Sequence, residues 1–379
     1  MSATPSADRP ATRLATRLAF LVAGFGIACW VPLVPLAKAR LGVDDAGLGL
    51  LLLCIGAGSV AAMVATGPLS ARLGSRPVIV AGGVALALLL PTLAVAATPI
   101  TLGVLLLLFG AALGSLDVAM NIHAVEVERA AGRPLMSGFH ALFSIGGFAG
   151  AALMTLLLSR GVASLAATLA CALPMLVAMA VATPRLLAVR AEPGPLFALP
   201  RGIVLLLALL AMVTFLVEGA MLDWSALLVV QRRLAPAAQA GLGYILFAAA
   251  MTAGRLGGDA LVARLGDRRT LAAGGLLACV GLVTLLALPA PFALGGFLLV
   301  GLGASNIVPV LFRRAGAQRR MPPALAIGAI TTLGYAGVLV GPAGIGVAAA
   351  AVGLPASFWA LAALLALVPL TARRAAGEV

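Results

Sequence analysis

The chain has 379 residues, of which 63% are hydrophobic and only 10% are charged, and its mean hydropathy is +1.16. No water-soluble domain can bury that much apolar surface, so these values exclude a soluble fold and indicate a protein that lies in lipid. The formal net charge is +13, but the basic residues gather in short clusters between apolar runs. We therefore expect anionic lipid headgroups, and no nucleic acid, as the counter-charge.

Twelve apolar runs of roughly 20 residues follow one another along the chain, each long enough to cross a bilayer as a helix. They are continuous rather than alternating, which favours helices over a β-barrel. The predicted spans are 14–36, 46–66, 77–97, 100–122, 136–158, 162–183, 203–229, 240–261, 270–289, 291–312, 325–347 and 354–371. The loops between them are too short for a separate catalytic domain, so we expect no enzyme activity.

The first run follows basic residues, as in a signal peptide. The stretch from Leu18 to Leu36 is too long for a signal peptide and lacks a clear cleavage site, so we expect it to be a retained span. Four cysteines fall inside the apolar runs. Their positions predict buried packing residues rather than a disulfide framework or a metal site.

A short basic sequence occurs twice, at the same point of each half. Residues 71–76 are Ala-Arg-Leu-Gly-Ser-Arg and residues 263–268 are Ala-Arg-Leu-Gly-Asp-Arg, 192 positions further on. This repeat predicts a duplicated membrane protein, in which two similar halves move around a site between them. A proline-containing segment between the two halves predicts the boundary between two bundles. We expect an N-terminal six-helix bundle over 1–183, a cytoplasmic linker over 184–202 and a C-terminal bundle over 203–379.

The predicted loops differ in charge on the two sides of the membrane. With both termini inside, the inner segments hold 19 of the 25 basic residues and the outer segments hold five. This asymmetry follows the positive-inside rule. We expect a multi-pass protein of a bacterial cytoplasmic membrane with both termini in the cytoplasm.

Residues 67–77, Gly-Pro-Leu-Ser-Ala-Arg-Leu-Gly-Ser-Arg-Pro, resemble the loop motif between helices 2 and 3 of the major facilitator superfamily. The resemblance implies an all-α fold of twelve transmembrane helices in two pseudo-symmetric six-helix bundles. The motif departs from the family at Ala71, where an aspartate is usual, and acids near the second copy can compensate. We expect the motif arginines to latch the inner face across the seam between the halves, with lipid headgroup contact as the alternative. The predicted cytoplasmic gate consists of Arg72, Gly74, Arg76, Asp259, Arg264, Asp267 and Arg268.

An ionisable side chain in hydrocarbon costs a few kcal/mol, so each one inside a predicted span is a candidate for function. Asp117 and Asn121 share one face of the fourth span, and His140 lies in the fifth. These stretches resemble the fucose-permease-like branch of the superfamily, which implies that Asp117 is a substrate-facing proton carrier. The alternatives are a structural Asp117, paired with Arg255 or capped by Asn121, and a His140 packed between helices instead of relaying protons.

The seventh span carries the second polar cluster, Glu218 to Ser225, which resembles the signature of the inner-membrane YbjJ-like permeases. Glu218 is the deeper acid, and we expect it to bind protons or solute. We expect Asp223 either to contact solute or to pair with Arg232 or Arg233 near the outer surface. Trp224 and Trp30 occupy similar places in paired spans. They predict either an interfacial aromatic belt or a stacking platform for a ring.

Arg255 and Asp259 are four residues apart on the eighth span, so they can form an intrahelical pair. Alternatively, Arg255 binds an anionic solute group or holds Asp117. Asn306 is a polar companion in the tenth span. The predicted solute-contacting residues are Trp30, Asn121, Asp223, Trp224, Arg255 and Asn306.

Together these features predict a secondary active transporter for a small polar solute, sugar-like in one interpretation, that works as a monomer and is coupled to protons. No phosphate-binding Gly-rich loop with Lys and Ser or Thr is present in the sequence, so ATP is not expected to drive it. We expect no cofactor and no metal, with the proton gradient as the energy source. The alternatives are proton-linked efflux of drugs or metabolites, and a membrane sensor or enzyme that transports nothing.

Overall fold

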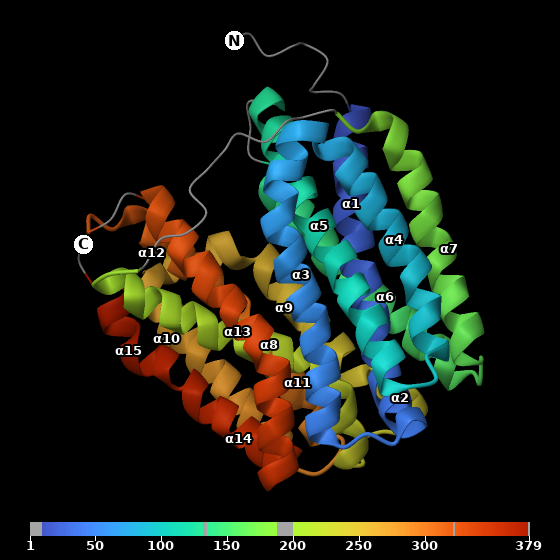
Figure 1. Ribbon diagram of the computed structural model, residues 1–379. Helices are drawn as coiled ribbons and strands as arrows, with labels where there is room; N and C mark the ends of the chain where they lie inside the picture. The colour runs from blue at the N-terminus through green and yellow to red at the C-terminus, as the bar shows by residue number, and fades with distance from the viewer. Residues whose placement is uncertain (1–9, 132–134, 188–199, 321–322, 378–379) are drawn as a thin grey trace. The chain divides into compact units, whose positions relative to one another are not determined.

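The computed structural model describes residues 10–131, 135–187, 200–320 and 323–377, in which every regular element is helical. Figure 1 shows the helices and their labels. The N-terminal half contains α1 (Pro10–Trp30), η1 (Val31–Leu33), α2 (Val34–Leu41), α3 (Asp45–Leu73), α4 (Ser75–Val95), α5 (Pro99–Ala131), α6 (Met136–Ser159), α7 (Ser164–Ala182) and η2 (Thr183–Arg185). The C-terminal half contains α8 (Ile203–Gln231), η3 (Ala237–Gln239), α9 (Leu242–Leu256), α10 (Gly258–Ala287), α11 (Phe292–Ala304), α12 (Ile307–Ala317), α13 (Pro323–Val352), α14 (Leu354–Leu365) and α15 (Leu367–Ala375).

Twelve helical stretches of the described chain are long and apolar enough to cross a membrane. This finding confirms the predicted all-α, twelve-span architecture. Most predicted ends lie within a few residues of the observed ones. The fourth stretch is longer than predicted and reaches Glu128, and the ninth begins at Ala260 rather than at residue 270.

The chain divides into two compact units. The first contains residues 1–43 and 51–193, and the second contains residues 44–50 and 194–379. The predicted linker lies largely outside the described residues, so its course stays a prediction.

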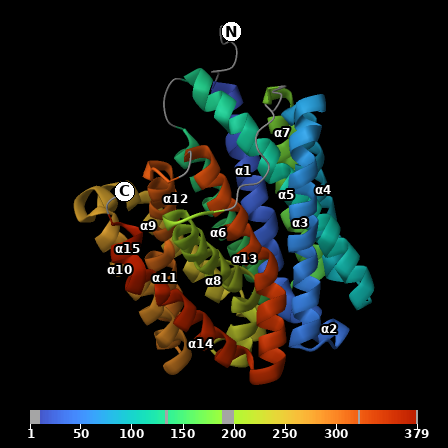
Figure 2. The ribbon, with the colours of Figure 1, turned by 60° about the vertical axis from the view of Figure 1, so that its left-hand side comes forward.

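The first unit is built around α1, which packs against α4, α5, α6 and α7. In α1 and the residues that follow it, 83% of the most apolar window is buried inside the protein. Small residues such as Ala15, Ala19 and Ala23 allow that packing, since each is fully buried and lets neighbouring helices approach. The turned view in Figure 2 again shows α1 lying among the helices of its own unit.

In the second unit α8 takes the position that α1 has in the first. It packs against α13, which corresponds to α6, and also against α9, α12, α14 and α15. On the other side of the unit, α10 packs against α11 and α15, and α11 packs against α9.

The sequence repeat is also a repeat of backbone conformation. Gly74 has φ 84° and ψ 162°, and Gly266, 192 residues later, has φ 75° and ψ 165°. Glycine adopts positive φ at little cost, whereas other residues are strained there. The remaining motif residues are helical, because α3 runs to Leu73 and α10 resumes directly after Gly266. The prediction that these motifs form loops is wrong. Ala, Arg and Leu are strong helix formers, so only the glycine interrupts the helix.

The duplication extends to the closest helix contacts. A Cβ atom on Gly146 of α6 would collide with the carbonyl oxygen of Leu21 on α1. A Cβ atom on Gly337 of α13 would collide with the carbonyl oxygen of Met212 on α8. Both members of the second pair lie 191 positions after those of the first. Gly146 and Gly337 therefore lie at a pair of equivalent helix crossings, in which the absence of a side chain permits backbone contact.

Candidate functional site

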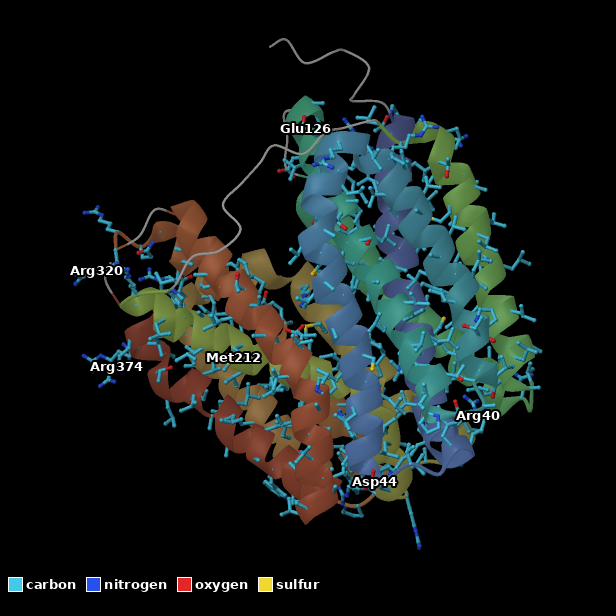
Figure 3. The ribbon with its side chains drawn as sticks, viewed as in Figure 1. Arg40, Asp44, Glu126, Met212, Arg320 and Arg374 are labelled. Atoms are coloured by element: carbon cyan, nitrogen blue, oxygen red, sulfur yellow. The ribbon has the colours of Figure 1, made fainter. Side chains whose placement is uncertain are left out.

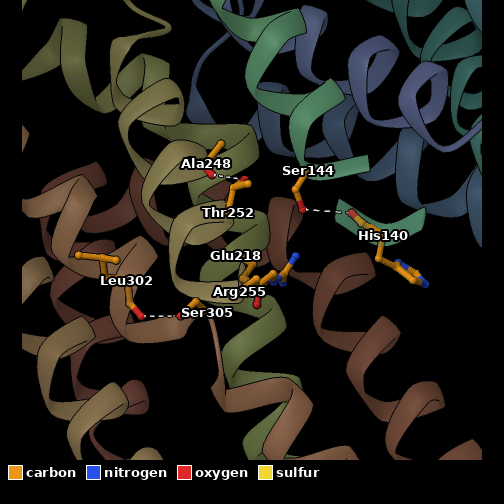
Figure 4. A network of polar contacts seen from close by, with 8 residues as sticks. All are labelled: His140, Ser144, Glu218, Ala248, Thr252, Arg255, Leu302 and Ser305. Carbon is orange, nitrogen blue, oxygen red and sulfur yellow. Dashed lines mark hydrogen bonds and ion pairs between the residues drawn. The ribbon is translucent and has the colours of Figure 1, made fainter. Parts of the chain in front are cut away.

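The clearest polar pair within the membrane spans is Glu218 on α8 and Arg255 on α9. Arg255 Nη2 lies 3.4 Å from Glu218 Oε2; the side chain of Arg255 is 37% exposed and that of Glu218 is 20% exposed. The other carboxylate oxygen, Glu218 Oε1, is buried and has no hydrogen-bond partner in the described part of the chain. Figure 4 shows the two side chains lying against each other. One oxygen of Glu218 is thus neutralised by Arg255, and the other retains its capacity to accept a hydrogen bond.

Further polar groups of α8 continue from this pair. Asp223 and Ser225 are buried, and the Ser225 hydroxyl has no partner among the described residues. The Tyr244 hydroxyl on α9 is close enough to Glu218, Arg255 and Asp223 to interact with them electrostatically. Tyr244 was not predicted as a site residue, although it is a polar residue inside an apolar span.

Trp30 and Trp224 are sealed inside the protein. They are 1% and 0% exposed, and neither indole N–H has a partner in the described chain. An interfacial belt would place the rings against headgroups, and a stacking platform would leave one ring face open. The structure shows neither arrangement.

Asp117 and Asn121 lie together on α5, as predicted from their spacing. Asn121 Nδ2 donates to the Asp117 backbone carbonyl at 2.8 Å and approaches Asp117 Oδ1 at 3.4 Å. Asp117 itself is half-buried. The amide therefore supports the carboxylate from one side, which leaves both the proton-carrier and the structural interpretation open.

His140 has an exposed side chain on α6. The edge of its ring faces Phe20 on α1, with ring centroids 5.1 Å apart. Its backbone carbonyl accepts a hydrogen bond from Ser144 at 3.3 Å, drawn as a dashed line in Figure 4. The histidine is thus held by aromatic packing while its imidazole stays accessible.

Arg255 and Arg232 both have partners that the sequence did not predict. Arg255 forms an ion pair with Glu218 on α8. The side chain of Asp259 lies outside the described residues, so the predicted Arg255–Asp259 pair stays a prediction. Arg232 donates to the backbone carbonyls of Leu285 and Leu288 on α10, not to Asp223. A guanidinium group satisfies the unpaired carbonyls at a helix end well, so Arg232 caps α10, and the pairing of Asp223 with Arg233 stays a prediction.

The side chain of Asn306 forms hydrogen bonds within the protein. It precedes α12 and is only 7% exposed. Its Nδ2 donates to the Gly254 carbonyl at 3.0 Å and to Ser305 Oγ at 2.9 Å. The amide thereby joins α9 to the break between α11 and α12. These contacts favour a role in holding the helices together over a role in contacting solute.

The predicted gate residues are divided between two environments. Asp267 forms ion pairs with Arg313 and, at 3.9 Å, with Arg314 on α12. The motif arginines are exposed, and within the described residues no hydrogen bond or ion pair holds them. They are Arg72, Arg76, Arg264 and Arg268. The predicted latch across the two halves stays a prediction.

In both units, a hydrogen bond holds the segment that follows the last helix, and the two bonds lie at equivalent places. This correspondence was not predicted from the sequence. In the second unit, Arg314 donates to the backbone carbonyl of Gly377, after α15. In the first unit, the backbone N–H of Leu187, after η2, donates to His123 Nε2 at 2.9 Å. His123 and Arg314 lie 191 positions apart. The sequence offset between the halves, applied beyond the motif, would have revealed this pair.

His123 is fully buried and its ring is satisfied on both nitrogens. Because Nε2 accepts from Leu187, Nδ1 carries the proton and donates to Thr16 Oγ1, 3.1 Å away. Thr16 Oγ1 in turn donates to the Thr12 carbonyl at 2.9 Å. This chain of hydrogen bonds fits a neutral imidazole and ties the end of η2 to α1.

Twelve apolar spans, two repeated halves and buried charges inside the spans define a multi-pass membrane transporter. The particular family follows from comparison with known proteins. The chain belongs to the Major Facilitator Superfamily, whose sequence profile matches residues 17–318.

Relatives and solved structures support this assignment. The chain is 50% identical to an uncharacterized MFS-type transporter of Yersinia pestis over 364 residues, which cover 95% of each protein. Its fold is similar to that of a mutant of the nucleoside transporter NupG, with a TM-score of 0.79, 11% identity and coverage of 96% and 99% of the two chains. It is also similar to a D-xylose-proton symporter, with a TM-score of 0.76, 14% identity and coverage of 97% and 98%. At these identities the two solved structures show the fold alone.

Proposed function

We propose that this protein is a proton-coupled secondary transporter that moves a small polar solute by alternating access. The observation that carries the proposal is the Glu218–Arg255 pair, with one buried carboxylate oxygen left without a partner. The proposal places the chain in a bacterial cytoplasmic membrane as a monomer, with both termini inside, as the arginine distribution favours. The resemblance to the fucose-permease-like and YbjJ-like branches supports a small polar cargo.

The pair couples charge to binding for a simple electrostatic reason. An ionised carboxylate inside the hydrocarbon region is costly unless a cation accompanies it. Adding a proton to Glu218 removes that need and leaves Arg255 free to bind an acceptor group of the solute. Glu218 Oε1 can accept a hydrogen bond from a solute hydroxyl or amine. Proton and solute then influence each other through the same two side chains.

Asp117 and His140 are the second candidate pair for proton movement. Asp117 is supported by Asn121 and stays half-buried, while His140 is exposed. The names of the two structural neighbours refer to a nucleoside and to D-xylose with a proton. Since both cargoes contain a sugar ring, sugars and nucleosides are the first solutes to test.

The test uses purified protein in liposomes with an imposed pH gradient and a panel of sugars, nucleosides and organic acids. We expect at least one solute to accumulate when the outside is acidic. Glu218→Gln should remove the proton dependence of that uptake. Glu192→Gln, which neutralises an acid of the predicted linker, serves as the control and should behave as wild type.

One result would contradict the proposal, and another would establish the direction of transport. If Glu218→Gln retains uphill uptake with the wild-type pH profile, the Glu218–Arg255 pair has no role in coupling. If solute leaves the liposomes as protons enter, the protein is an exporter.

A further inference from the structure

An apolar groove runs along the outer surface of the first unit, between α1 and α7. It has a volume of about 580 Å³ and is open along one side. It is lined by Leu14, Leu18, Leu173, Pro174, Val177, Ala178 and Val181. All of these side chains are apolar, so the groove accommodates hydrocarbon and offers no hydrogen bond to a polar solute.

The groove follows the helix axes. Leu14 and Leu18 are one turn apart on α1, and Leu173, Val177 and Val181 are one turn apart on α7. At ~1.5 Å per residue, the α7 side extends over about 12 Å. That length matches a long stretch of one acyl chain lying parallel to the helices.

The two helical stretches that form the groove carry arginines toward the end where α1 begins and α7 finishes. Arg17 is exposed on α1, between Leu14 and Leu18 in sequence. Arg185 is exposed at the end of η2, and its Nη1 donates to the Val181 carbonyl at 2.6 Å. The hydrogen bond from Leu187 to His123 fixes the backbone two residues after Arg185. One guanidinium is therefore held against a groove residue before any ligand arrives.

We propose that this groove is a binding site for an anionic glycerophospholipid. One acyl chain fills the groove, and the phosphate lies between Arg17 and Arg185. With both termini in the cytoplasm, the site belongs to the inner leaflet. Neighbouring lipid tails are as apolar as the groove, so burial of the tail gives little preference among lipids. The two arginines give the site its selectivity, because they attract a net negative headgroup.

The test is native mass spectrometry of the delipidated full-length protein in mild detergent. It is titrated with phosphatidylglycerol or phosphatidylcholine of identical acyl chains. We expect roughly tenfold tighter binding of phosphatidylglycerol, as two basic residues near a headgroup would give. The double variant Arg17→Gln/Arg185→Gln should reduce the preference to less than about twofold. Arg185→Lys keeps the charge and should retain most of the preference.

Two further variants separate the site from general surface charge. Ala178→Trp fills the groove without changing charge, and it should weaken the binding of both lipids. Arg160→Gln removes an exposed arginine after α6, and it should leave the preference unchanged. Thermal unfolding of each variant identifies any that fail to fold. If the double variant does not fold, the lipid preference of Arg185→Lys is compared with that of the wild-type protein.

Three outcomes would overturn the proposal. The first is equal affinity of the wild-type protein for the two lipids, which would mean that the groove takes any acyl chain. The second is a double variant that retains the full preference. The third is an Arg160→Gln variant that loses as much preference as the double variant.

Discussion

Arg40 and Arg232 make the same contact in the two halves of the protein. Arg40, labelled in Figure 3, donates to the carbonyls of Leu93, Ala94 and Ala96 at the end of α4, at 2.9, 2.5 and 3.1 Å. Arg232 donates to the carbonyls of Leu285 and Leu288 at the end of α10. Each of these residues lies 192 positions after its counterpart Arg40, Leu93 or Ala96. In each half, the arginine joins the C-terminal end of one helix to the open carbonyls at the C-terminal end of another.

We predict that Arg40→Gln and Arg232→Gln each lower stability by roughly 2 kcal/mol, because charge-assisted hydrogen bonds to helix-end carbonyls are lost. Thermal unfolding in detergent should show a midpoint lower by a few degrees for each variant. Arg160→Gln is the matched control and should unfold like wild type. An unchanged midpoint in both variants would mean that these arginines are not helix caps in the membrane.

We predict that Gly146→Ala and Gly337→Ala are both destabilising, since the added methyl group meets the backbone of the neighbouring helix. Overpacking of this kind costs about 1–3 kcal/mol. A Cβ atom on Gly138, on the same helix as Gly146, would meet no other helix within 4 Å among the described residues. Gly138→Ala should be neutral or slightly stabilising, because alanine favours helix over glycine by about 1 kcal/mol.

The measurement for the glycine variants is the loss of folded protein on heating, followed by size-exclusion chromatography. Equal behaviour of Gly146→Ala and Gly138→Ala would contradict the close helix crossing. A difference between them with no matching difference for Gly337→Ala would contradict the equivalence of the two halves.

We predict that Asp117→Asn abolishes proton-driven accumulation of solute but leaves solute exchange intact. The substitution keeps the shape of the side chain and removes the group that can carry a proton. Uptake against a concentration gradient and counterflow exchange are measured in the same liposomes. If uphill uptake persists at the wild-type rate, Asp117 has the structural role that its contact with Asn121 also allows.

We predict that His123→Ala releases the segment after η2 from α1. The variant removes the acceptor of the Leu187 N–H and one of the two hydrogen bonds of Thr16 Oγ1, and an unsatisfied buried group costs about 1–3 kcal/mol. Trypsin cleavage after Arg185 should become several-fold faster than in wild type. Thr168→Ala is the control, because it removes a buried hydroxyl within α7 that bonds only to its own helix. Equal cleavage rates in His123→Ala and wild type would rule out the fastening role.

The sequence was sufficient for the spans because crossing a bilayer depends on local length and apolarity. The helices from Ile203 and from Leu354 begin within a residue of the predicted starts. The helix ends at the repeated motif were predicted wrongly. A basic helical turn has low hydropathy, and hydropathy alone does not distinguish such a turn from a loop. The Asp117–Asn121 contact was predictable, since both residues are on one helix four positions apart.

The partners of the buried charges were harder to predict. Arg255 forms an ion pair with Glu218, 37 residues away on another helix, and the spacing of residues along one helix gives no sign of this contact. Arg232 was expected near Asp223 and instead caps α10. Sequence spacing ranks neighbours on one helix, whereas interhelical distances depend on how the helices cross.

The amino-acid sequence by itself determined that this protein crosses the membrane twelve times and arose by duplication, because hydropathy and repeated residues are properties of the chain. Only the tertiary structure decided which polar groups meet. Glu218 with Arg255, His123 with Leu187, and Arg40 with the end of α4 are contacts between helices distant in sequence. In lipid, helices associate through close packing and hydrogen bonds rather than through burial of apolar faces. Those contacts are therefore fixed by the packed bundle and not by any local pattern of residues.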